Sequence, residues 1–108
     1  MRRSWSAGHD RNDAKVHLDL NAPSFQSDLF SLDVTEVKKV FKTFNKLRAL
    51  TWNEVFRDKG LHWEEVKSVP GKYTIRLSQS YRAVVTRDAG WMRFAALHLD
   101  HDGAYGKK

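Results

Sequence analysis

The sequence predicts a single α+β domain, in which an antiparallel sheet of about four strands carries two to three helices packed on one face. Three patterns predict this fold class. Between Tyr73 and His98 the chain alternates apolar and polar residues in three runs separated by turn residues. Residues 34–50 repeat apolar side chains at steps of three and four, as an amphipathic helix does. A short alternating run at residues 15–20 places one strand before the helices.

Composition limits the classes of function. The chain has 108 residues, enough for one domain with a modest core, and no cysteine, which excludes disulfides and thiolate metal sites. Lys and Arg number 19 against 13 Asp and Glu, a net charge of +6. This excess favours a polyanionic partner, either nucleic acid or an acidic protein, or is simply a soluble basic surface. With no apolar run long enough for a signal peptide or a membrane span, we expect a cytoplasmic protein without a membrane partner.

The N-terminal half supplies the first strand and the helices. Residues 1–14 are polar and are predicted to form a flexible arm, and residues 15–108 the domain. Lys15 to Leu20 reads as a strand with its even positions facing inward, followed by a short helix over residues 24–32. Asp33 to Glu36 has the form of a capping box and opens the main helix. The polar side of that helix is either a solvated face or a phosphate contact, and carries Lys38, Lys39, Lys42, Lys46 and Arg48.

A second capping box begins at Thr51 and predicts a short helix that ends at Gly60. Residues 61–67 are expected to form a strand or an extended connection, and Pro70-Gly71 a turn.

The meander supplies the remaining strands, with turns at residues 78–80 and 87–90, the second using Gly90 for a positive φ. Because side chains alternate across a strand, odd and even positions should occupy opposite faces. The odd face is mostly apolar and should pack on the helices: Tyr73, Ile75, Leu77, Tyr81, Ala83, Val85, Ala95 and Leu97. The even face is mixed and basic: Thr74, Arg76, Ser78, Arg82, Val84, Thr86, Met92, Phe94, Ala96 and His98.

Two groups of residues carry potential chemistry. Arg76 and Arg82 are predicted to stand almost opposite each other, which is unfavourable by about 0.2–1 kcal/mol unless an anion lies nearby. That anion is a phosphate, a partner's carboxylate or one of the chain's own acidic groups. The second group is the chain end, which is suited to acid–base chemistry, to metal binding or merely to docking as a polar tail: His98, Asp100, His101, Asp102 and Tyr105.

The order of elements, the hairpin from Tyr73 to Val84 and the closing His101-Asp102-Gly103-Ala104-Tyr105 resemble the RelE/ParE superfamily of bacterial toxin–antitoxin toxins, and its HigB-like branch in particular. The resemblance covers residues 15–106. It implies metal-independent cleavage of messenger RNA on the ribosome, with the 2′-hydroxyl as nucleophile and no cofactor. It also implies a tightly bound antitoxin.

The resemblance assigns expected roles to individual residues. Arg76 and Arg82 would stabilise the phosphate in the transition state, with His101 and Tyr105 transferring protons, Lys67 or Lys72 assisting and Asp100 orienting. The basic helix face would contact ribosomal RNA. Two alternatives stay open: a ParE-like toxin of the same fold that inhibits DNA gyrase without nuclease activity, and an RNA- or protein-binding domain with no catalysis.

Overall fold

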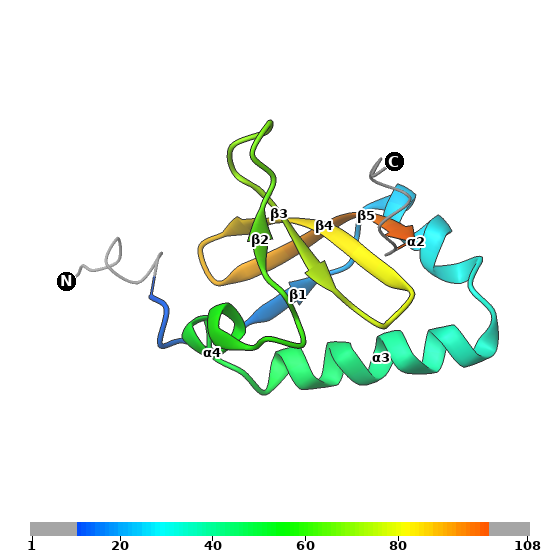
Figure 1. Cartoon of the computed structure of the whole chain (residues 1–108), viewed down its shortest axis with the longest axis horizontal. Coiled ribbons are helices and arrows are strands. Elements are labelled where there is room, and N and C mark those ends of the chain that lie inside the picture. The colour runs from blue at the N-terminus through cyan, green and yellow to red at the C-terminus, as the bar shows by residue number, and fades with distance from the viewer. Residues whose placement is uncertain (1–10, 100–108) are drawn as a thin grey trace.

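A computed structural model describes residues 11–99 and is shown in Figure 1. In chain order the elements are β1 (His17–Asp19), α2 (Pro23–Phe30), α3 (Val34–Arg48), α4 (Trp52–Arg57), β2 (Glu64–Glu65), β3 (Lys72–Arg76), β4 (Tyr81–Asp88) and β5 (Trp91–Leu99). The predicted α+β class is confirmed. No helix in the described part of the chain is long and apolar enough to cross a membrane.

Within residues 11–99 the sheet has five strands in the order β1-β5-β4-β3-β2. Strands β2 to β5 form the predicted antiparallel sheet of about four strands, and β1 adds a parallel strand beside β5, so the sheet is mixed. The cause is the connection: three helices separate β1 from the meander, and a connection of that length allows a parallel neighbour. β1 is therefore an edge strand beside the last strand of the chain.

The helix starts follow the predicted caps. The Asp33 carboxylate accepts a hydrogen bond from the Glu36 amide at 2.9 Å, and Thr51 and Glu54 form a reciprocal capping box. The predicted helix end at Gly60 was wrong, because α4 stops at Arg57 and residue 58 is extended. There the Asp58 carboxylate accepts from the Leu61 amide at 3.0 Å, and this contact turns the chain without a glycine cap.

The core lies between the helices and one face of the sheet. Phe25 of α2 and Phe44 of α3 both contact Phe94 of β5, with ring centroids 5.2 and 5.5 Å apart. Trp52 of α4 is fully buried, and the Arg87 guanidinium lies 4.1 Å over its ring. The same Arg87 donates to the Asn12 side chain at 2.7 Å, which ties residue 12 to the domain.

A β-bulge changes the predicted faces of β5. Val84 pairs with Ala96 but Val85 pairs with Phe94, so Ala95 is an extra residue in β5. Alternation restarts at the bulge, and Met92 and Phe94 are buried at 0% and 1% exposure. Their predicted place on the polar face was therefore wrong.

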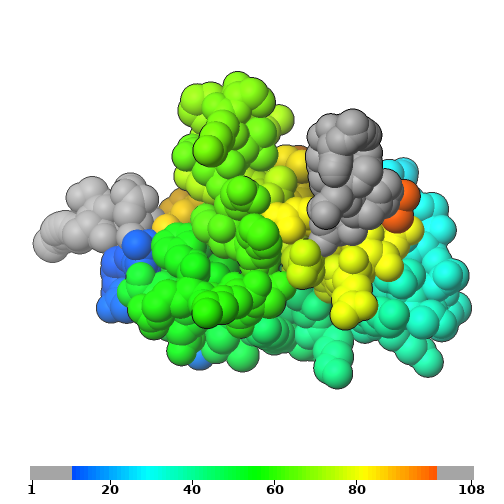
Figure 2. Space-filling model, in the orientation of Figure 1, coloured from blue at the N-terminus to red at the C-terminus, as the bar shows by residue number. Residues whose placement is uncertain are grey.

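The turns also differ in one detail. Gly71 has a φ of 87°, as a Pro-Gly turn requires, but in the turn between β4 and β5 the positive φ of 57° belongs to Ala89 and not to Gly90. The Arg87 side chain donates to the Ala89 carbonyl at 2.8 Å and braces this turn. Figure 2 shows the connection between β2 and β3, residues 66–71, standing out from the body of the domain.

Candidate functional site

The face of the sheet opposite the core is lined mainly by polar and charged side chains, and we call it the polar face. It contains a row that crosses three strands, because Arg76 of β3 pairs with Arg82 of β4, and Arg82 pairs with His98 of β5. This confirms that the two arginines stand directly opposite each other. We call Arg76, Arg82 and His98 the cationic row.

A second row lies one step along the same face. Glu64, Thr74, Val84 and Ala96 pair in that order across β2 to β5. Ala96 is thus diagonal to Arg82, and its small side chain leaves space beside the arginine. Glu64 is exposed, and its carboxylate lies 3.5 Å from the His62 imidazole. The polar face therefore offers cations, a carboxylate and a small-residue gap within two adjacent rows.

Arg82 is held in place by defined contacts. Its side chain is nearly buried, with the residue 7% exposed. One terminal nitrogen donates to the Thr74 hydroxyl at 2.7 Å and to the His62 carbonyl at 3.1 Å. The backbone of His62 has a φ of 51°, an uncommon conformation for a non-glycine residue. These contacts orient the guanidinium before any ligand arrives, which is the preorganisation that electrostatic catalysis requires.

Arg76 connects the cationic row to the end of α3. Its amide donates to the Leu61 carbonyl at 2.7 Å, and Arg76 and Lys46 of α3 are both among the residues that line a hollow of about 310 Å³. Lys46 forms an ion pair of 2.9 Å with Asp58. Burial acts to raise the pKa of Asp58, but hydrogen bonds from Lys46 and the Leu61 amide outweigh it and hold the pKa below its usual range.

The remaining predicted site residues are distributed over several surfaces. Lys72 lies on β3 at the same side as Arg76, whereas Lys67 is exposed in the connection between β2 and β3. α3 packs on the opposite, core side of the sheet, so the structure does not bring its other cations to the cationic row: Lys38, Lys39, Lys42 and Arg48. Four predicted residues lie outside the described part of the chain: Asp100, His101, Asp102 and Tyr105.

Sequence reasoning grouped His98 with the chain end and missed Glu64 and Thr74 as members of the site. The signal that could have found Thr74, and could have joined His98 to the arginines, was strand alternation, which places Thr74 beside Arg76 and His98 beside Ala96 on one face. Among residues 11–99 no three His, Asp or Glu side chains gather in a way that could hold a metal ion.

Comparison with known proteins gives one structural match. No family model matches the chain, and no curated protein matches it in sequence. A chain of the solved YoeB–YefM complex from Staphylococcus aureus superimposes with a TM-score of 0.51 at 22% identity, covering 82% of this chain and 100% of that one. The chain therefore shares its fold with a chain of that complex, and the fold class predicted from the sequence is confirmed.

Proposed function

We propose that this chain is the toxin of a toxin–antitoxin pair and that it cleaves messenger RNA on the ribosome. The observation that carries the proposal is the cationic row, with Arg82 fixed by Thr74 and the His62 carbonyl. The phosphodiester backbone of RNA carries one negative charge per nucleotide along an extended chain, and such a chain would match a row of cations across a sheet. The site of action would be the cytoplasm, where ribosomes translate.

The chemistry follows from where charge develops. The 2′-oxygen loses its proton and attacks the adjacent phosphorus, the bond from phosphorus to the 5′-oxygen breaks, and that oxygen takes up a proton. Arg76 and Arg82 would neutralise the additional negative charge on the phosphoryl oxygens in the transition state. Since the guanidinium of Arg82 is already oriented, little reorganisation is needed at the moment of reaction.

Proton transfer needs one group on each side of the phosphorus. Within the described chain His98 is a titratable group in the row of the arginines, and Glu64 is one in the adjacent row of the polar face. The roles implied by the resemblance for His101, Tyr105, Asp100 and the lysines Lys67 and Lys72 remain proposals alongside them. An imidazole is suited to either step because it titrates near neutral pH.

A protein partner is part of the proposal. The structural neighbour is a complex of two proteins, YoeB with YefM. The net charge of +6 favours an acidic partner that neutralises the toxin until it is released.

The proposal is tested by brief expression in a bacterial host, followed by primer extension on translated messages. Wild type should produce discrete breaks, and Arg82→Ala, Arg76→Gln, His98→Gln and His101→Ala should each reduce them. Arg57→Ala is the matched control, because Arg57 is an exposed cation on α4 outside the polar face. Circular dichroism shows whether the Arg82→Ala variant still folds. If that variant does not fold, the result for Arg76→Gln decides the test.

Other outcomes point elsewhere. Intact messages together with trapped gyrase–DNA complexes would replace the nuclease by a gyrase inhibitor of the same fold. If messages stay intact, gyrase is not trapped on DNA and growth is normal, the result would favour a binding domain without catalysis.

A further inference from the structure

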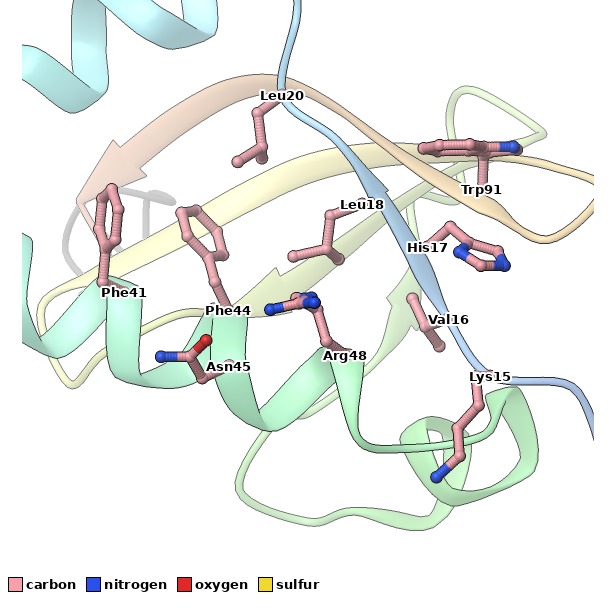
Figure 3. A pocket seen from close by; sticks show the side chains of 10 residues that line it. All are labelled: Lys15, Val16, His17, Leu18, Leu20, Phe41, Phe44, Asn45, Arg48 and Trp91. Carbon is pink, nitrogen blue, oxygen red and sulfur yellow. The ribbon is translucent and has the colours of Figure 1, made fainter.

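A groove lies between α3 and the edge strand β1, on the core side of the sheet, whereas the cationic row lies on the polar face. It encloses about 530 Å³. Figure 3 shows Leu18 of β1, Leu20 just after β1, and Phe41 and Phe44 of α3 pointing into it. Phe44 forms a buried floor, whereas Phe41 is 46% exposed, so a large ring stands open at the groove wall. Trp91, also 46% exposed, lines the opposite end.

The charge of this groove has one sign. Its polar lining residues are Lys15, His17, Asn45 and Arg48, and none of the described residues that line it is Asp or Glu. Lys15 donates to the Ala49 carbonyl at 2.6 Å, which holds its charge at the rim. An occupant with apolar side chains for the interior and carboxylates for the rim would match both properties.

The edge of β1 adds a third property. The His17 amide donates to the Gly90 carbonyl toward β5, so alternation turns the amide and carbonyl of Leu18 away from β5, to the outer edge of the sheet. The backbone groups before and after Leu18 on this edge are already hydrogen-bonded. The Val16 amide donates to the Leu50 carbonyl, and the Leu20 carbonyl accepts from the Gln26 side chain. Within residues 11–99 the Leu18 backbone makes no hydrogen bond outside the β1–β5 pairing. An extended chain could pair at this position.

We infer that this groove is the anchor site for an extended, acidic segment of the antitoxin, which alternates apolar and carboxylate side chains and pairs with the edge of β1. The inference rests on the proposed function and makes it more specific. A stretched peptide fits better than RNA, because the interior is built of aliphatic and phenyl groups and the available edge offers backbone hydrogen bonds.

The position of the groove separates anchoring from catalysis. Trp91 begins β5, and His98 lies seven residues further along the same strand, about 23 Å away at the rise of an extended chain. Substitutions in the groove should therefore weaken neutralisation and leave toxicity intact.

The experiment uses the full chain and, as probe, the protein encoded by the reading frame adjoining its own gene. The test variant is the double substitution Phe41→Ala/Trp91→Ala. The matched control, Phe30→Ala/Val69→Ala, also removes two exposed apolar side chains but none from the groove. We expect the dissociation constant of the test variant to rise roughly 100-fold, about tenfold for each anchor. The control should bind as wild type does.

Two readouts keep this inference separate from the proposed function. Growth arrest in the absence of the antitoxin should be equal for wild type and both variants, and co-expression should rescue all but the test variant. Equal rescue of every variant would overturn the groove as anchor while the toxin proposal stands. If the probe fails to bind wild type, the inference is overturned. The toxin proposal is then tested separately, by whether wild type expressed without the probe cleaves messages.

Hydrogen exchange tests the strand pairing. In the complex the Leu18 amide should exchange more than about tenfold more slowly than in the free chain. Unchanged exchange would overturn pairing at the edge of β1. Single-stranded RNA that binds wild type but not the test variant, or a self-association that the test variant abolishes, would instead identify a different occupant and overturn the inference.

Discussion

The Thr74 hydroxyl accepts a 2.7 Å hydrogen bond from the Arg82 guanidinium, diagonally across the β3–β4 pair. An uncharged side chain thus directs a nearly buried cation of the proposed active site. We expect Thr74→Val, which keeps the shape of the side chain but not the acceptor, to lower the rate of message cleavage about tenfold or more. Thr74→Ser should keep most of the rate. Cleavage of a ribosome-bound message in a purified translation system gives both values, and equal rates for the two variants would contradict the role.

Asp58 should make stability depend on pH. Its pKa lies below the usual value in the folded chain, so its contribution is fully present above the unfolded pKa and is lost as pH falls through the folded one. We expect Asp58→Asn to lower the free energy of unfolding at pH 7, and the difference from wild type to vanish in strong acid. Urea titrations across this range measure it. A difference that is constant with pH would show that the ion pair with Lys46 contributes nothing.

The turn between β4 and β5 should be improved by a single substitution. Ala89 has a φ of 57°, which glycine adopts without cost, whereas a side chain at Gly90 would meet only the His17 ring at 3.5 Å. We expect Ala89→Gly to stabilise the chain by about 0.5–1 kcal/mol. Thermal unfolding measures the change. Gly90→Ala serves as the comparison and should be close to neutral, and the opposite order would contradict the assignment of the turn.

The aromatic cluster of the core should dominate stability. Phe94 is 1% exposed and contacts the rings of Phe25 and Phe44, so we expect Phe94→Ala to cost about 3–5 kcal/mol. Phe30 is 74% exposed, and Phe30→Ala should change stability by less than about 0.5 kcal/mol. Chemical denaturation measures the free energy of unfolding of both variants. Similar losses at both positions would show that the core is not where the structure places it.

Much of the fold could be predicted because its signals are local. Asp33 and Thr51 mark helix starts through hydrogen bonds within one turn, and the hairpin around Gln79 sets Arg76 against Arg82. The bulge could not be predicted, since Ala95 and Ala96 are chemically identical and only packing decides which one is extra. Without it Arg82 would pair with Leu97, so the place of His98 in the cationic row depends on a feature with no local signal.

The parallel pairing of β1 with β5 could not be predicted from the sequence either. β1 is three residues long and its partner lies more than seventy positions away, so neither its neighbour nor its direction leaves a pattern in the sequence. The groove beside it depends on that pairing and on the position of α3, and it was not foreseen either.

The same pairing has a consequence for how the chain folds. His17 can pair with Trp91 only after the more than seventy residues between them have been synthesised, so β1 joins the sheet only once β5 exists. Contacts so distant in sequence also slow folding, because a long loop must close before they form. The edge of β1 therefore forms after the antiparallel hairpins have formed. An acidic peptide that pairs with this edge would bind only chains in which β5 is already in place.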